Sequence, residues 1–252
     1  MNEAMEAEFD TVAEWTAGVV TDLGFEYALA AGCRGSGSPP ALNWLIDAMG
    51  LRRGDVLVDS GAGIGGPAAY AARTRAVRPL LVEPEPGACR AARALFGLPV
   101  LRASGSAIPL PDASTDAAWS LGVLCTMDDQ PGLLRELARV VRPGGAIGLL
   151  VYVATRTLTE DERPEGNSFP SGEDLGTLVD GAGLRIVDQR PAVELGEGST
   201  EWQRRTDRVR DELAWRYGDH PAWLTAERQS RTMGELIASC AVMGTLLHIR
   251  RR

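Results

Sequence analysis

Residues 55–67 read DVLVDSGAGIGGP, and this stretch decides the fold of the chain. Its first six residues form a short apolar run that leads into glycines, which is typical of a buried strand. Four glycines follow within six residues, and a glycine lets a ligand approach the backbone without meeting a Cβ atom. The stretch therefore predicts a strand, a ligand-binding turn and a helix in succession.

Apolar runs alternate with helical stretches after this turn. We expect further strands at 78–83, 100–103, 117–124, 146–153, 184–189 and 243–250. Pro86 and Pro131 each open a helical stretch with apolar residues on one face. Strands that alternate with helices in this way predict an α/β fold with a doubly wound, mostly parallel sheet.

The flanking regions predict helices outside this α/β core. We expect an N-terminal helical segment over 1–50, with helices at 9–31 and from Ser38 to Gly50. The α/β core is expected to span 51–196, followed by a helical insert or lid over 197–242 and the final core strand within 243–252. The insert carries two apolar stripes with helical spacing, and Trp202 in one of them is expected to pack in the core.

The composition excludes several classes of function. The net charge is −8, and all 26 basic residues are Arg. This acidic balance argues against a nucleic-acid partner, because phosphate binding requires a basic face. No apolar run approaches the roughly 18 residues of a membrane span, and the start, MNEAMEAEFD, is acidic rather than basic. We therefore expect a cytoplasmic protein without a membrane partner, whose oligomeric state the sequence leaves open.

Two kinds of cofactor fit the glycine turn. Gly61, Gly63 and Gly66 satisfy the GxGxxG pattern of dinucleotide sites. Glu83 ends the second predicted strand, where either cofactor needs a carboxylate for its ribose hydroxyls. Asp59 stands directly before the turn, where it would repel a pyrophosphate and attract a cationic cofactor with a free amino group. An NAD(P)-dependent oxidoreductase remains the alternative on these residues.

The order of motifs resembles a known family. DxGxGxG at 59–65 is followed by Glu83-Pro84, then GSAIPLPDASTDAAWS (105–120), then RPGG (142–145). This arrangement resembles the class I S-adenosylmethionine-dependent methyltransferases over about 55–153, and more loosely over the whole chain. The resemblance implies a Rossmann-like methyltransferase fold, S-adenosylmethionine as cofactor and a small organic molecule as methyl acceptor.

The resemblance also implies roles for single residues around the cofactor. The methionine part is expected to lie near Asp59, the backbone of Gly61, Ala62 and Gly63, the sulfonium-side residues Leu121 and Gly122, and Arg34. Surface solvation is the alternative for Arg34. The nucleoside part is expected to contact Glu83 through the ribose and Pro84, Ser106 and Ala107 through the adenine. This chain has Ser106-Ala107 where the family often has an acidic residue, so we expect the backbone there to meet the adenine amino group.

The catalytic residue stays open at this stage, because no acid–base dyad is recognisable. Asp128, Tyr152 and His220 are candidates for a general base, and Asp129 is expected to cap a helix. We expect catalysis without a metal, since YVATRT (152–157) lacks the acid that a magnesium site would need. A protein that binds the cofactor without turnover is a further alternative.

The acceptor is expected to bind under the helical insert. Ligands of doubly wound folds enter at the carboxyl ends of the strands, and an insert before the last strand can reach that edge. Aromatic side chains suit a small, partly apolar acceptor. The candidates that lie off the insert's stripe or flank the break at Gly218 are Trp215, Tyr217 and Trp223.

Overall fold

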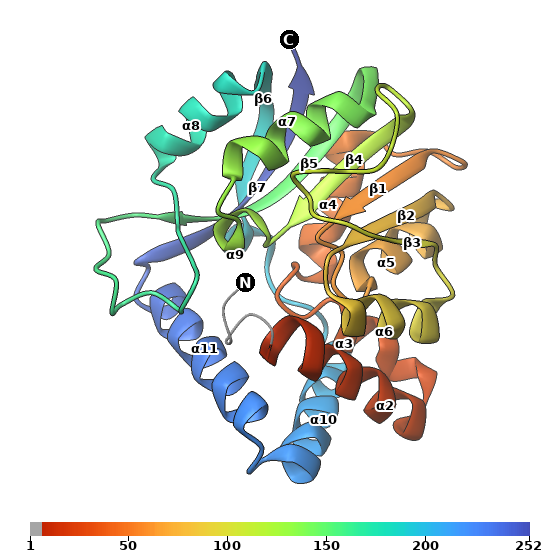
Figure 1. The fold of residues 1–252 in the computed structure, drawn as a ribbon, viewed down its shortest axis with the longest axis vertical. Helices are drawn as coiled ribbons and strands as arrows, with labels where there is room; N and C mark the ends of the chain where they lie inside the picture. Colours follow the sequence, from red (N-terminus) through yellow and green to blue (C-terminus); the bar gives the residue numbers. More distant parts are fainter. Residues whose placement is uncertain (1–6) are drawn as a thin grey trace.

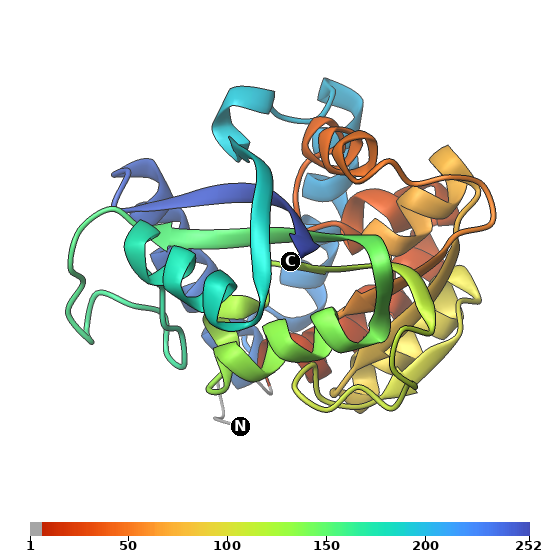
Figure 2. The same ribbon diagram turned by 90° about the horizontal axis from the view of Figure 1, so that it is seen from above.

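A computed structural model, in which residues 7–252 are described, shows a seven-stranded sheet with helices on both faces (Figures 1 and 2). The strand order is β3-β2-β1-β4-β5-β7-β6. The strands are β1 (Val56–Ser60), β2 (Arg78–Glu83), β3 (Val100–Arg102), β4 (Thr115–Leu121), β5 (Val141–Ala154), β6 (Leu184–Pro191) and β7 (Val242–Arg251). The predicted doubly wound α/β fold is confirmed.

The last strand departs from the order of a dinucleotide-binding sheet. Strands β1 to β5 pair in parallel, whereas β7 pairs antiparallel with both β5 and β6. The dinucleotide-binding order is 3-2-1-4-5-6. An antiparallel strand between the fifth and sixth positions therefore separates this fold from that class.

Helices from successive crossovers cover the two faces of the sheet. One face carries α4 (Pro39–Met49), α5 (Gly66–Arg75) and α6 (Pro86–Phe96), and the opposite face carries α7 (Gln130–Val140) and α8 (Gly172–Gly181). Figure 2 shows α7 and α8 across the sheet from α4. Two further short helices follow strands of the sheet, the 3₁₀ turn η3 (Leu124–Thr126) after β4 and α9 (Ala192–Leu195) after β6.

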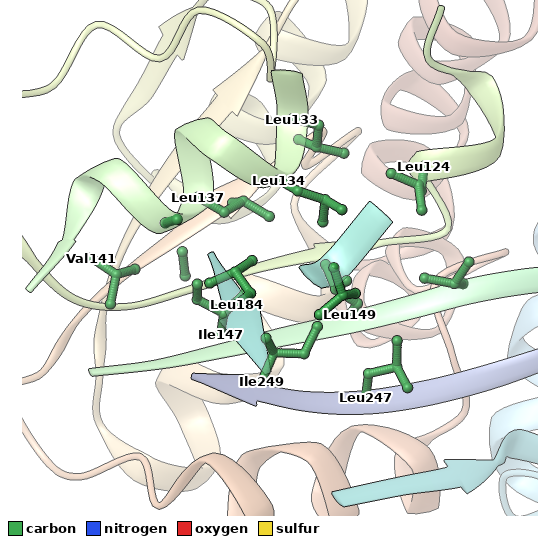
Figure 3. Packing of buried hydrophobic residues seen from close by; sticks show 14 of the residues in the cluster. Leu124, Leu133, Leu134, Leu137, Val141, Ile147, Leu149, Leu184, Leu247 and Ile249 are labelled. Atoms are coloured by element: carbon green, nitrogen blue, oxygen red, sulfur yellow. The ribbon is translucent and has the colours of Figure 1, made fainter. Parts of the chain in front are cut away.

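The core between the sheet and α7–α8 is built from aliphatic side chains (Figure 3). Leu133, Leu134 and Leu137 of α7 are fully buried against Ile147 and Leu149 of β5. Side chains such as these each contribute about 1.5–3 kcal/mol when they leave water. The packing fixes the sheet and therefore the places where its strands end.

Residues 7–32 and the two helices before β7 form a helical layer beside this core. The layer consists of η1 (Ala7–Val12), α2 (Ala13–Leu23), η2 (Phe25–Tyr27), α3 (Ala28–Gly32), α10 (Thr200–Tyr217) and α11 (Pro221–Ala238). Its helices share one apolar cluster, to which Val20, Val209 and Trp223 belong, and α2 also packs on α6. Figure 1 shows α2, α3, α10 and α11 gathered at one end of the sheet.

Several predicted element boundaries are confirmed. Ser38 caps α4, and Gly50 ends it in a left-handed conformation. Asp129 accepts a hydrogen bond from the Gly132 N–H at 2.8 Å and so caps α7, as expected.

Two predicted boundaries were wrong. The helix expected over 9–31 is interrupted at Gly24, which has φ +125°. The strand expected over 117–124 ends at Leu121, because Gly122 turns the chain with φ +79° and η3 begins at Leu124.

Candidate cofactor site

The glycine turn follows β1 and leads into α5, as predicted. Gly61 has φ +73°, and a Cβ atom there would lie 2.4 Å from a methyl carbon of Val123. Nothing lies within 4 Å of the position that a Cβ of Gly63 would take. The protein's own packing therefore requires Gly61, whereas the surface above Gly63 is open to a ligand.

Glu83, at the end of β2, is held beside this turn. Its carboxylate accepts hydrogen bonds from the Gly63 N–H at 2.8 Å and from the Glu85 N–H at 3.0 Å. The side chain is buried, and burial raises the pKa of Glu83 to about 7, an effect that the two N–H groups oppose. The negative charges of Glu85 and Asp10 raise this pKa further. The strand end thus presents a fixed carboxylate.

Asp59 lies one strand away and is buried more deeply. Its Cα pairs with that of Trp119 on β4, and its Oδ2 has no hydrogen-bond partner among the described residues. Burial raises the pKa of Asp59 to about 7. Interactions of the carboxyl with the Trp119 side chain and the Ala68 backbone N–H oppose this rise, and the charge of Glu83 adds to it. A buried carboxylate oxygen without a donor is costly, so a ligand that supplies a donor or a positive charge would stabilise it.

Neither carboxylate is neutralised by a basic side chain. Within residues 7–252, no Arg or His forms an ion pair with Asp59 or Glu83. Buried charges in proteins are normally paired or bound to a ligand. The two strand ends therefore fit a ligand that is cationic and rich in hydrogen-bond donors. They do not fit a pyrophosphate.

The chain after α3 passes over the same edge of the sheet. A Cβ atom on Gly66 would lie 2.1 Å from the carbonyl carbon of Gly32, so the two backbones touch. Further along, the Tyr152 hydroxyl donates to the Gly35 carbonyl oxygen at 3.2 Å, and a Cβ on Gly122 would lie 2.9 Å from the same oxygen. Residues 32–35 therefore run from the start of α5 to the end of β4.

Sequence reasoning missed the contribution of η1 to the site. The Asp10 carboxylate accepts a hydrogen bond from the Gly87 N–H at the start of α6. Asp10 also contributes to the raised pKa of Glu83. The contact joins residues 77 positions apart, and a single Asp in a helical stretch carries no motif that would reveal it.

The other predicted cofactor residues are spread along this edge. Pro84 is exposed, and its carbonyl oxygen accepts from Arg102 Nε at 3.2 Å. The Ser106 N–H donates to Ser104 Oγ at 3.2 Å and the Ala107 N–H to Ser104 O at 3.1 Å. Ala62 and Leu121 are buried, Gly122 is half-buried, and Arg34 is exposed on the passing segment.

The three candidate bases lie apart from one another. Asp128 is exposed between η3 and α7. Burial raises the pKa of Tyr152 to about 12, so its hydroxyl stays protonated and acts as a hydrogen-bond donor at neutral pH. His220 caps α11, where its Nδ1 accepts from the Ala222 N–H at 3.2 Å, and its ring meets Trp15 edge-on.

The three aromatic candidates of the insert have different surroundings. Trp223 is buried in the apolar cluster of the helical layer. Tyr217 stacks on Trp15 with ring centroids 4.0 Å apart. Trp215 is 81% exposed. Trp202 packs edge-on against Tyr70 and joins the core cluster under α4, as expected.

Two absences apply to the part of the chain that the structure describes. No three His, Cys, Asp or Glu side chains gather there as a metal site would require. None of the helices within 7–252 has both the length and the apolar character needed to span a membrane.

Comparisons with known proteins identify the family of the chain. Residues 58–149 match the family model described as a methyltransferase domain. A 27-O-demethylrifamycin SV methyltransferase from Amycolatopsis mediterranei is 36% identical, over 42% of this chain and 41% of that protein. An uncharacterized methyltransferase of Mycobacterium bovis is 31% identical over 71% of this chain and 70% of its own length. The chain spans only about half the length of the first curated relatives, between 41% and 56%.

Solved structures share the fold across nearly the whole chain. The [4+2]-cyclase SpnF has a TM-score of 0.71 at 20% identity, with 97% of this chain and 96% of that chain covered. A methyltransferase from Geobacter sulfurreducens, solved with S-adenosyl-L-homocysteine, has a TM-score of 0.64 at 17% identity. The alignment covers 86% of this chain and 93% of that chain. At such identities the likeness concerns the fold. Taken with the curated relatives and the carboxylates at the ends of β1 and β2, it places the chain in the class I S-adenosylmethionine-dependent methyltransferase family.

Proposed function

We propose that the protein binds S-adenosylmethionine at the carboxyl ends of β1, β2 and β4 and transfers its methyl group to a small organic acceptor without a metal. The observation that carries this proposal is the pair of buried, unneutralised carboxylates, Asp59 and Glu83. A cofactor with a sulfonium, an ammonium and two ribose hydroxyls would offset both charges. A dinucleotide would bring its negatively charged phosphates close to these two carboxylates, which would repel them.

Each strand end would hold one part of the cofactor. Glu83 would accept hydrogen bonds from the ribose hydroxyls while the Gly63 and Glu85 N–H groups keep its carboxylate in place. Asp59 would attract the amino end of the methionine part, and the open surface at Gly63 would lie under the cofactor. Pro84, Ser106 and Ala107 would border the adenine, and Leu121, Gly122 and Arg34 the sulfonium and carboxylate ends.

The chain's main contribution to the reaction would be alignment. When bound, the cofactor supplies a methyl group that is already electrophilic. Tyr152 would hold the Gly35 segment across the end of β4 and so keep water from the reacting groups. Orienting two reactants in this way can supply about 7–11 kcal/mol of the barrier. We assign no general base. The phenol of Tyr152 stays protonated at neutral pH, Asp128 is exposed, and His220 caps α11.

The acceptor would enter beneath the helical layer formed by η1–α3 and α10–α11. The curated relatives include methyltransferases named for a rifamycin precursor and for sterols, and both names denote organic small molecules. Tyr217 stands at the contact between α10 and α2, where its ring stacks on Trp15. We infer that Tyr217 and the neighbouring Trp215 and Trp223 shape the acceptor side, with Trp223 acting through the packing of the layer.

A screen with methyl-labelled S-adenosylmethionine tests this function. The purified protein is offered a panel of phenols, amines, carboxylic acids and polyketide-like alcohols, with and without EDTA. We expect label to appear in at least one acceptor, and EDTA to leave the rate unchanged. A rate that EDTA abolishes and Mg²⁺ restores would contradict the metal-independent reaction. Tight cofactor binding without label in any acceptor would favour the non-catalytic alternative.

A further inference from the structure

A cavity lies at the carboxyl end of β5, beside the start of α8. Its volume is about 440 Å³, within the range of about 300–1,000 Å³ that holds small organic ligands. Its wall combines two guanidinium groups, two apolar side chains and the capping pair of α8: Arg156, Arg163, Leu158, Phe169, Ser171 and Asp174. None of the sites assigned above includes this cavity.

The loop that carries Arg163 is held firmly at both ends. Thr155 Oγ1 donates to the Cys240 carbonyl oxygen at 2.6 Å, and the Ser168 N–H donates to the Cys125 carbonyl oxygen at 2.7 Å. In the middle of the loop, the Glu165 N–H donates to Gln229 Oε1 at 2.9 Å. The loop is therefore anchored to α11 on one side and to η3 on the other, which holds the backbone around Arg163 in place.

Arg163 supplies the unpaired positive charge of the cavity wall. Its Nε is buried and has no hydrogen-bond partner among the described residues. By contrast, Arg156 is paired with Glu162 at 2.7 Å, and Asp174 is held by the Ser171 hydroxyl at 2.7 Å. A buried guanidinium N–H without an acceptor is unusual, because buried polar groups normally have a hydrogen-bond partner. Arg163 lines the cavity and forms no ion pair with another described residue, so the charge of the wall favours an anionic ligand.

Two apolar side chains of the cavity wall pack against the same cluster as Tyr152, which lies toward the proposed cofactor site. Leu158 and Phe169 pack in one cluster with Tyr152. Tyr152 in turn contacts the Gly122 position at the end of β4, where the sulfonium end of the cofactor is proposed to lie. A ligand held by Arg163 would extend its apolar part along these side chains toward the methyl group.

We propose that this cavity binds the carboxylate of the methyl acceptor, with Arg163 as its hydrogen-bonding partner, so that the acceptor is a partly apolar organic acid. The assignment as acceptor rests on the proposed methyltransferase function. The fork of an Arg side chain matches the two oxygens of a carboxylate. A singly charged carboxylate is favoured over a doubly charged phosphate, because Asp174 on the same wall opposes additional negative charge.

Ligand-observed NMR titrations with three probes of similar shape test this proposal. The probes are 3-phenylpropionate, its neutral amide and phenyl phosphate, each titrated into the parent protein, Arg163→Gln and Arg163→Lys. Arg204→Gln serves as the control, because Arg204 is exposed on α10. Calorimetric titration of S-adenosylmethionine into each variant reports separately on the cofactor site.

We expect the parent to bind 3-phenylpropionate more tightly than its amide or phenyl phosphate. Arg163→Gln should lower the affinity for the acid about tenfold to a hundredfold and leave the amide unchanged, since a charge-assisted hydrogen bond is lost. Arg163→Lys should retain part of the affinity, and Arg204→Gln all of it. Cofactor affinity should stay within about twofold in every variant.

Three results would overturn the proposal: equal binding of acid and amide by the parent, unchanged binding of the acid by Arg163→Gln, or tighter binding of phenyl phosphate. The comparison of acid and amide in the parent holds even if Arg163→Gln fails to fold. Failure of the methyltransferase function would appear separately, as an absence of cofactor binding by the parent or as an absence of label transfer in the acceptor screen.

Discussion

Two residues, Asp59 and Glu83, set the charge of the carboxyl edge of the sheet. Burial raises the pKa of each carboxyl from about 4 in an unfolded chain to about 7. An acid with a raised pKa stabilises the fold fully below its unfolded pKa, and this contribution is lost as the pH rises through the folded pKa. The ligand-free protein should therefore lose stability from these groups between about pH 4 and pH 7.

The affinity for S-adenosylmethionine should change with pH in the opposite direction. A cationic ligand favours the ionised carboxylates, so affinity should rise about tenfold for each such group between pH 6 and pH 8. Calorimetric titrations at pH 6, 7 and 8 measure this, with Glu83→Gln beside the parent. The amino group of the ligand titrates equally with both proteins. The quantity to compare is therefore the slope of the logarithm of affinity against pH for the parent and for Glu83→Gln. Identical slopes would show that Glu83 does not ionise on binding.

Among the elements, α3 and α5 meet at two glycines beside the cofactor turn. A Cβ atom on Gly66 would lie 2.1 Å from the carbonyl carbon of Gly32, and backbone atoms cannot give way as a flexible side chain can. Gly176, inside α8, has nothing within 4 Å of its Cβ position. The two positions therefore form a matched pair for one substitution.

Gly66→Ala should destabilise the protein by about 1–3 kcal/mol, because the added methyl group overpacks the contact with Gly32. Gly176→Ala should stabilise it by about 0.5–1 kcal/mol through helix propensity. Thermal unfolding of both variants measures the difference. Gly66→Ala should also lower the affinity of the protein for S-adenosylmethionine, because the segment over the cofactor must shift. Unfolding temperatures that match for the two variants would mean that α3 does not touch the turn.

In the whole molecule, the N-terminal helices and α10–α11 form one layer beside the sheet. Trp223 lies at its centre with 4% of its surface exposed, whereas Trp215 on the same layer is 81% exposed. Both belong to the insert that precedes β7. The stability of the layer should therefore depend on Trp223 and not on Trp215.

Trp223→Ala should cost about 3–5 kcal/mol of unfolding free energy, since it leaves a large cavity in the apolar cluster. Trp215→Ala should stay within about 0.5 kcal/mol of the parent. Urea unfolding of the two variants tests this pair. A similar loss for both would place the two rings in similar environments, contrary to the packing of the layer.

The sequence predicted the sheet and its glycine turn because both depend on local patterns. Apolar runs mark buried strands, and Ser38 and Asp129 cap helices through residues three positions away. The contact of Asp10 with Gly87 and the burial of Trp223 depend on residues far apart in the chain. Helical spacing defines a face but not the element that covers it, so the joint layer of N-terminal and insert helices could not be predicted.

The identity of the cofactor is tested most directly by one calorimetric measurement. S-adenosylmethionine and NAD⁺ are titrated separately into the parent protein and into Glu83→Ala. We predict that the parent binds S-adenosylmethionine and not NAD⁺. Glu83→Ala should bind S-adenosylmethionine several-fold to about a hundredfold more weakly, because hydrogen bonds to a charged group of about 1.5–3 kcal/mol each are lost and partly replaced by water. Binding of NAD⁺ by the parent, or unchanged affinity of Glu83→Ala for S-adenosylmethionine, would contradict the proposed site.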